Sequence, residues 1–332
     1  MSELPEPSSA RLAFGDRAES IAAVDDPILA LGFLEGEHLD PSGPLTPTGH
    51  LRRRQLISRL SEVGQTASAV LALAVLSIVV YSVVEHGAGL LNIGFLTKGP
   101  PVSQELPGGG IAPEIVGTAL LIGVATVIAM PLGVLVALYL TEFAPDTRSA
   151  RVIGLALDLL NGLPTIIVGL FIFGLFVVGG GQSGFAGSLA LAIIMLPLIA
   201  RAAQEVLRLV PNSMREAADA LGISRWRAVR GVVLPSALGG ILTGTVLAIA
   251  RAAGETAPLI LVSSVFGNSV TLRMFGQALP NIPVYIYTAS EGASAYGFER
   301  AWGAAFVLLM FIFFTNLGGR ALLGRSRAKL MG

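Results

Sequence analysis

The chain has 332 residues, of which 53% are hydrophobic and 13% are charged, whereas soluble proteins average about 25% charged residues. A soluble globule is therefore nearly excluded. The chain contains no Cys, which removes disulfides, thiolate metal sites and Cys nucleophiles, and its three His lie outside the long apolar runs. We accordingly expect no metal site, no cofactor and no catalytic residue.

The N-terminal part of the chain is polar. Residues 1–50 are rich in Pro, Ser, Asp and Glu, and they are expected to form a disordered cytoplasmic tail. The basic segment 51–64 begins with LRRRQLISRL, which suits a short helix lying on the inner leaflet. A plain stop-transfer charge cluster explains this segment equally well.

Runs of about twenty apolar residues follow, which is the length that spans a bilayer as a helix. Two of the runs are interrupted, one by Asp158 and Asn161 and the other by Arg251 and Glu255. The predicted spans are 66–84, 115–140, 152–178, 185–200, 236–266 and 301–317. The fold class is thus an all-α polytopic membrane protein with one six-helix domain over 65–325 and a short C-terminus over 326–332. Three prolines, at 131, 164 and 197, fall inside predicted spans and should kink them.

The basic residues give the orientation, because Lys and Arg are enriched on the cytoplasmic side of a membrane. With the N-terminus inside, eighteen basic residues fall in cytoplasmic segments and three fall outside. Both termini should therefore face the cytoplasm of a bacterial inner membrane.

Nucleotide-binding and catalytic motifs are absent from the sequence. There is no G-x-x-x-x-G-K-[ST] phosphate-binding loop, and Lys occurs only at positions 98 and 329. No Ser-His-Asp set and no HExxH motif occurs either, so an intramembrane enzyme fits poorly. If this protein moves a solute with ATP, another chain hydrolyses the nucleotide.

The longest basic segment, 201–235, contains signals for two short helices. Ser213 and Glu216 have the spacing of a capping box, which predicts a helix from Met214 that stops at Gly222. Ser224 precedes a second predicted helix that ends against a proline. A capped two-helix unit outside the membrane should pack on a protein partner.

This segment resembles the EAA loop of bacterial ABC-transporter permeases, with Val232 in the usual Ile position. In that family the loop supplies the coupling helix, which sits in a groove of the cytoplasmic ATPase. The matching residues, which the resemblance assigns to ATPase coupling, are Glu216, Ala217, Ala218, Gly222, Leu234 and Pro235.

A second run, Ala250-Arg-Ala-Ala-Gly-Glu-Thr-Ala-Pro258, is similar to one in the A-type permease of the bacterial phosphate-specific transport system. The resemblance covers roughly residues 65–325. It implies import of inorganic phosphate and a partnership with a C-type permease subunit, two copies of an ATPase and an extracytoplasmic phosphate-binding protein. The outer loop 267–300 would dock that binding protein, although an aromatic belt explains its tyrosines equally well.

The charged residues of the second run are candidate substrate contacts. An Arg inside a membrane helix costs about 2.5–3.5 kcal/mol, so Arg251 should face protein or an aqueous cavity. Glu255 can pair with it one turn on. Because Arg presents a fork of donors that suits phosphate oxygens, we expect Arg251 to hold the anion in transit. Glu255 would hold or release it as the pathway changes state, and Arg201 would form a second basic contact at the cytoplasmic mouth. Alternatively, Arg251 and Glu255 lock helices or pair with the partner permease, and Arg201 anchors in the inner leaflet.

Other functions remain open at this point. An ABC permease for sulfate, molybdate or phosphonate would share most of these features, and so would a membrane scaffold or sensor. A secondary transporter driven by an ion gradient would leave the coupling loop without an explanation. Asp158 and Asn161 are expected to be structural, since an acidic group repels an anionic substrate.

Overall fold

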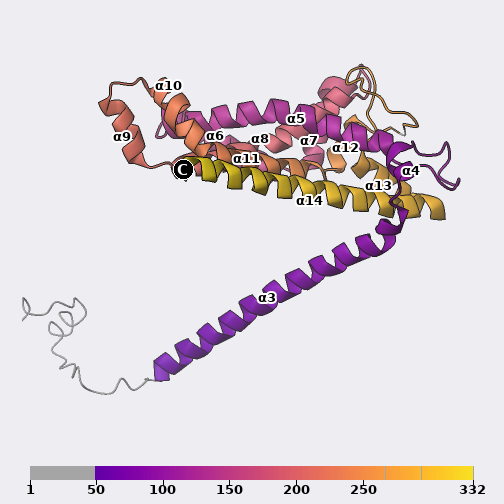
Figure 1. Cartoon of the computed structure of the whole chain (residues 1–332), viewed down its shortest axis with the longest axis horizontal. Helices are drawn as coiled ribbons and strands as arrows, with labels where there is room; N and C mark the ends of the chain where they lie inside the picture. Colours follow the sequence, from indigo (N-terminus) through magenta and orange to yellow (C-terminus); the bar gives the residue numbers. More distant parts are fainter. Residues whose placement is uncertain (1–48, 266, 293, 332) are drawn as a thin grey trace, which may run out of the picture. The chain divides into compact units, whose positions relative to one another are not determined.

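The computed structural model describes residues 49–265, 267–292 and 294–331, and within them the secondary structure is helical without strands (Figure 1). The predicted all-α class is confirmed. The α-helices are α3 (Gly49–Gly87), α4 (Ile93–Thr97), α5 (Ala112–Leu138), α6 (Arg148–Gly162), α7 (Thr165–Ile172), α8 (Gly184–Arg208), α9 (Asn212–Ala220), α10 (Arg225–Ala228), α11 (Leu234–Ala252), α12 (Ala257–Val262), α13 (Ile282–Glu291) and α14 (Ala295–Met331). Shorter segments are the 3-10 helix η1 (Ala88–Leu90) and the π-helical η2 (Tyr139–Phe143), η3 (Phe173–Val177) and η4 (Val229–Val233).

Five helical stretches of the described residues are long and apolar enough to cross a membrane. They are Gln55–Leu90, Ala112–Phe143, Gly184–Arg208, Arg225–Ala252 and Ala295–Gly319. A sixth span is obtained if the bent pair Arg148–Gly162 and Thr165–Val177 counts as one. The six predicted spans therefore correspond to these five helices and the bent pair.

The bent pair corrects one prediction. Pro164 was expected to kink a single helix, but it lies between α6 and α7, whose axes differ in direction by 101°. Leu163, just before it, is extended with ψ 135°. A proline disfavours the helical conformation of the preceding residue and lacks an amide donor, so the helix ends there. Pro131 and Pro197 do lie inside helices, as predicted.

Other boundaries also differ from the predictions. The basic segment 51–64 is not a separate short helix but part of the continuous α3. The predicted disordered tail over 1–50 falls almost entirely outside the described residues. The span predicted over 236–266 ends at Ala252 and is followed by the short α12, and the predicted loop 267–300 contains α13 and the start of α14.

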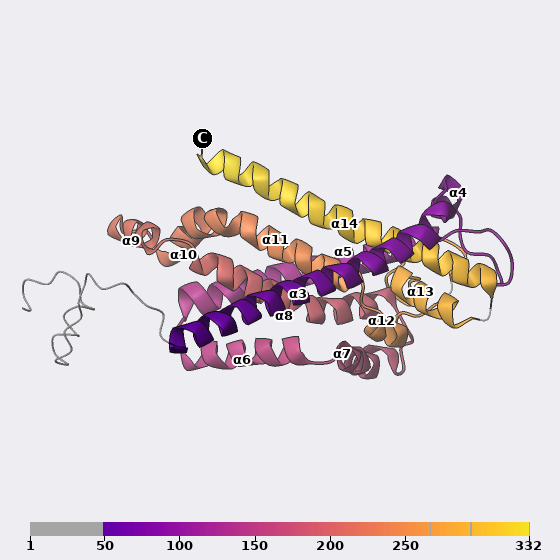
Figure 2. The ribbon, with the colours of Figure 1, turned by 90° about the horizontal axis from the view of Figure 1, so that it is seen from below.

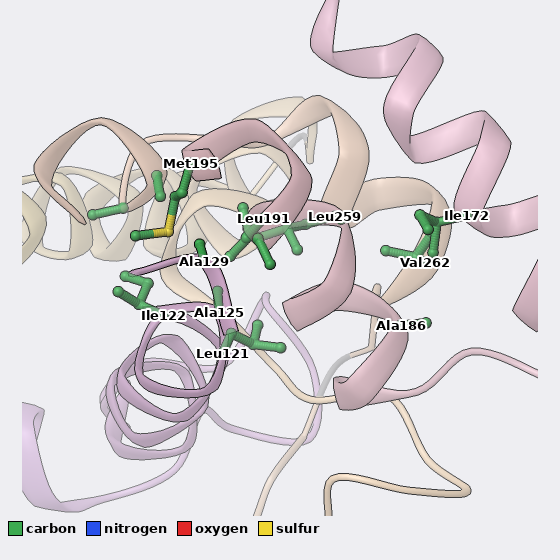
Figure 3. Close-up of a cluster of buried hydrophobic side chains, with 14 of the residues drawn as sticks. Leu121, Ile122, Ala125, Ala129, Ile172, Ala186, Leu191, Met195, Leu259 and Val262 are labelled. Carbon is green, nitrogen blue, oxygen red and sulfur yellow. The ribbon is translucent and has the colours of Figure 1, made fainter. Parts of the chain in front are cut away.

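The chain divides into two compact units, 1–74 and 75–332, and the features described below lie in the second. Its main core forms where α5 and α8 pack against each other, with α12 and α7 beside them (Figure 3). Leu121 and Ile122 of α5 face Leu191 and Met195 of α8, and small residues such as Ala125 let the backbones approach closely. This core fixes α5 and α8 as one body.

The two ends of the second unit differ. Helices α9 and α10 lie at one end, whereas α4 and α13 lie at the other (Figures 1 and 2). A smaller apolar cluster, with Leu138 of α5, Leu207 of α8, Val229 and Val233 of η4 and Ile241 of α11, fills the α9–α10 end. The α9–α10 loop is thereby joined to the same helices that build the main core.

Candidate functional site

The segment that resembles an EAA loop presents its motif on α9. Glu216 and Ala217 are exposed, and Ala218 is buried at 4% exposure. Gly222 follows the helix with φ +68°, a left-handed conformation that favours glycine, so the predicted stop is confirmed. The exposed motif residues leave one face of α9 open on the isolated chain.

The start of α9 differs from the prediction. The helix begins at Asn212, two residues before Met214, and follows Pro211 directly. No side chain caps its first turn, so the capping box expected from Ser213 and Glu216 is absent. Pro211, whose φ is fixed near the helical value, starts the helix instead.

The second helix of the loop consists of α10 and η4, as predicted over about 225–233. Val229 and Val233 are buried, whereas Trp226 is 53% exposed with its ring centroid 6.1 Å from that of Phe143. The helix continues without a break into α11, where Leu234 and the following proline of the motif occupy the first turn. The second helix of the loop and α11 are therefore one continuous helical segment.

A buried ion pair that the sequence analysis missed connects this loop to α5. Nη2 of Arg215 donates to Oε1 of Glu142 at 2.7 Å, and Nε donates to Oε2 at 3.1 Å. The remaining Arg215 donors bind the carbonyls of Leu207 and Val210 and the side chain of Asn212. All five N–H donors of the guanidinium thus have acceptors. Residues 73 positions apart gave no local sequence signal for this pair.

The candidate substrate pair, Arg251 and Glu255, lies at the end of α11. The two are an ion pair with 3.7 Å between Nη2 and Oε1, so the predicted pairing is confirmed. Arg251 was expected near the middle of a helix, but it lies in the last turn because α11 ends at Ala252. The Arg251 side chain is 53% exposed and that of Glu255 is 14% exposed. The guanidinium therefore reaches the surface of the isolated chain.

Arg201 lies on α8 and is held by α6. Its Nη2 donates to Oδ1 of Asp158 at 2.5 Å and to the carbonyl of Gly154 at 2.8 Å, and Nη1 donates to Gln204. The predicted structural role of Asp158, a bond to a neighbouring helix, is thus observed. The two candidate basic contacts lie on different helices, Arg201 on α8 and Arg251 on α11, and each has its own carboxylate partner.

Arg300, at the opposite end from α9, is a second cation that the sequence analysis left unexplained. It is 4% exposed and donates to the hydroxyl of Tyr285 and to the carbonyls of Gln104, Leu106 and Gly108. Burial raises the pKa of the Tyr285 phenol, and the Arg300 bond opposes that rise. Arg300 therefore fastens the 98–111 loop to α13 and α14.

No group of three or more His, Asp or Glu side chains in the described ranges is arranged to hold a metal ion. The described residues contain three ion pairs: Arg215–Glu142 beside the exposed α9, Arg251–Glu255 at the end of α11, and Arg201–Asp158 between α8 and α6.

Comparison with known families identifies the class of protein. Residues 129–327 match the family described as "Binding-protein-dependent transport system inner membrane component". The match includes the α9–α10 loop and the Arg251–Glu255 pair. The chain belongs to this family, and it is a multi-pass membrane protein that serves as a transporter subunit.

Similar proteins identify which group of inner membrane transport components the chain belongs to. The phosphate transport system permease protein PstA 1 of Mycobacterium tuberculosis is 36% identical over 302 residues, which are 90% of this chain and 94% of the relative. PstA of Xylella fastidiosa is 35% identical over 286 residues, 85% of this chain and 98% of the relative. PstA of Yersinia pestis is 34% identical, with coverage of 83% and 92%. Within the inner membrane components, the chain belongs to the PstA family.

Solved structures agree with this placement at the level of the fold. An inward-facing structure of the MetNI methionine ABC transporter has a TM-score of 0.52 at 19% identity, covering 65% of this chain and 93% of that one. A bacterial ABC transporter involved in the import of alginate has a TM-score of 0.50 at 15% identity, covering 80% and 99%. The expected ABC permease fold is confirmed.

Proposed function

We propose that this chain is the permease subunit of an ATP-driven importer that moves inorganic phosphate into the bacterial cell. The observation that carries the proposal is its similarity over 90% of its length to a relative named phosphate transport system permease, in a chain that ends a membrane helix with an ion-paired arginine. The sequence contains no phosphate-binding loop, so ATP is hydrolysed by a partner.

Arg251 is the residue proposed to contact phosphate in transit. Its guanidinium is half exposed and held only loosely by Glu255 at 3.7 Å, so most donors of this planar group remain available to bind two oxygens of a phosphate. Its position in the last turn of α11 also favours a cation, because the carbonyl end of a helix carries partial negative charge. When the anion leaves, Glu255 pairs with the Arg251 guanidinium again.

Arg201 is proposed as a second basic contact nearer the α9 end. Its side chain is 30% exposed, and its partner Asp158 is 63% exposed, so both remain within reach of water. Screening by water weakens such a pair, and an incoming anion competes with the carboxylate for Nη2. Because Asp158 competes with phosphate for Arg201, it lowers the affinity of this contact for phosphate.

The exposed motif on α9 is proposed to bind the ATPase, and Glu216, Ala217, Ala218, Gly222, Leu234 and Pro235 form the coupling segment. Glu216 and Ala217 offer an open helical face, and Leu221 beside them is 78% exposed. The excess of basic residues supports a cytoplasmic position for this loop and for both termini. A C-type permease, two ATPase copies and a phosphate-binding protein complete the assembly.

The test is uptake of radiolabelled phosphate by proteoliposomes that contain the full complex, with ATP and the binding protein supplied. We expect ATP-dependent uptake that unlabelled phosphate abolishes and that an equal excess of sulfate, molybdate or phosphonate leaves unchanged. Competition by one of these anions as strong as that by phosphate would reassign the substrate. Uptake by this chain alone under an ion gradient would replace the ABC mechanism with that of a secondary transporter.

A further inference from the structure

A loop that receives force from an ATPase needs a stiff attachment to the helices that it moves. In this molecule the attachments of α9 are few, because α9 is nine residues long and Ala218 is its buried residue. Most of its surface therefore makes no apolar contact within the chain. Directional polar bonds must supply the stiffness.

Arg215 supplies those bonds to two core helices at once. It grips Glu142 of η2, which continues α5, through two N–H donors, and it also donates to the carbonyl of Leu207 in the last turn of α8. The Glu142 side chain is 3% exposed and that of Arg215 is 22% exposed, so water competes little for either. Because α5 and α8 pack together in the main core, the Arg215 guanidinium attaches α9 to both of these helices.

We infer that Arg215 and Glu142 form the mechanical linkage through which movement of the coupling loop turns α5 and α8. Arg215 is a positioning residue in this sense, since it acts through the helices and touches no substrate. The inference rests on the proposed function, because a linkage has a use only if an ATPase acts on α9.

The energetics favour a linkage over a purely stabilising role. A buried ion pair contributes little net stability, because the cost of removing both charges from water offsets their attraction, and apolar replacements of similar volume are often as stable. What a two-donor pair adds is a fixed relative orientation of its two backbones. The pair can therefore be replaced so that stability is kept and the orientation is lost.

The experiment uses the full complex and the double variant Arg215→Met with Glu142→Leu, which leaves no buried charge without a partner. We expect the ATPase to remain bound and active while the anion transported per ATP hydrolysed falls about tenfold, within the usual range of coupling between sites. The matched control is Arg208→Gln, which removes one positive charge from an exposed position of the same segment and should leave the ratio unchanged.

A second readout is independent of which anion is carried. The chain has no Cys of its own, so Ser213→Cys on α9 and Leu135→Cys on α5 can be spin-labelled in the purified chain before it is assembled with the partner subunits. Both positions are exposed, and Leu135 follows Pro131, so it lies on the same side of the kink as Glu142. In the wild-type background we expect the same distance with and without trapped ATP, whereas the double variant should give different distances in the two states.

Either of two results overturns the linkage: an unchanged transport-to-ATP ratio in the assembled double variant, or a wild-type label distance that changes between states. If the double variant fails to assemble, Glu142→Gln replaces it, because the amide keeps the shape and one acceptor but loses the charge. An unchanged ratio in that variant also contradicts the inference. Failure of the wild type to import phosphate would refute the proposed substrate and leave the label distances to decide the linkage.

Discussion

Two arginine–glutamate pairs of this molecule differ in how deeply they are buried and in how many guanidinium donors already have acceptors. The distance from Nη2 to Oε1 is 2.7 Å between Arg215 and Glu142, whose side chains are 22% and 3% exposed. The same distance is 3.7 Å between Arg251 and Glu255, whose side chains are 53% and 14% exposed. The first pair uses every donor of its guanidinium, and the second leaves most of them open. The same two residue types thus make a fixed joint in one place and a contact able to exchange partners in the other.

The difference arises from the backbone around each pair. Arg215 is enclosed by the carbonyl end of α8 and by the π-helical turn of η2, which supply acceptors from both sides. Arg251 lies where α11 stops at Ala252, and Glu255 follows in an irregular segment before α12. An arginine at a helix end beside irregular backbone has fewer acceptors fixed around it. The number of backbone acceptors around each arginine therefore accounts for the difference between the two pairs.

The largest expected effect on stability comes from breaking the buried pair on one side. Glu142→Ala leaves the Arg215 charge without its counter-ion in a largely buried position, and such a change costs about 3–5 kcal/mol. Glu255→Ala should cost less than about 1 kcal/mol, because Arg251 can be solvated. The free energies of unfolding, measured by denaturant titration in mixed micelles, check this contrast. Equal losses in the two variants would remove the distinction between the pairs.

A smaller loss of stability is expected where the backbone of α5 touches the backbone at Pro280, at the end of the unit away from α9. A Cβ added at Gly117 of α5 would lie 1.9 Å from the carbonyl oxygen of Pro280, whereas one added at Gly123 of the same helix meets no atom within 4 Å. Gly117→Ala should therefore destabilise the fold by about 1–3 kcal/mol. Gly123→Ala, the matched control, should stabilise it by about 0.5–1 kcal/mol through helix propensity alone. Thermal unfolding of the two variants in the same detergent checks this prediction. An unchanged unfolding temperature of Gly117→Ala would show that the backbone around Pro280 can move to admit the added Cβ.

The smallest effect is expected at the third ion pair. Arg201 and Asp158 are 30% and 63% exposed, so Asp158→Asn should change the free energy of unfolding by no more than about 1 kcal/mol. If Arg201 also meets phosphate, the same variant should tighten the retention of phosphate and slow its release. Uptake measured over a range of phosphate concentrations checks both parts. A loss of several kcal/mol would show that the α6–α8 joint is as rigid as that of Arg215.

Local patterns in the sequence were enough to predict much of this molecule. The helical class, the apolar spans and the end of α9 at Gly222 all follow from composition and from single residues with restricted backbone preferences. The Arg251–Glu255 pair was also predictable, because its members are four positions apart. Features carried by short-range spacing can be read without a structure.

Long-range features and irregular ends were not predictable in the same way. Glu142 and Arg215 come together only after α5, α8 and α9 have packed, and no spacing rule connects them. The break at Pro164 does not follow from the sequence, because a proline is compatible with either one bent helix or two helices, and packing decides between them. The end of α11 at Ala252 was missed because residues 253–266 remain largely apolar.

The measurement that tests the central claim most directly compares wild-type and Arg251→Gln complexes in proteoliposomes, with ATP hydrolysis and phosphate uptake recorded together. Arg251→Gln keeps a polar side chain but removes the charge, so the account predicts that the ATPase remains bound and active while uptake falls about a hundredfold. Arg208→Gln serves as the control for loss of one positive charge. Normal phosphate uptake by Arg251→Gln would contradict the proposal that this arginine holds the anion in transit.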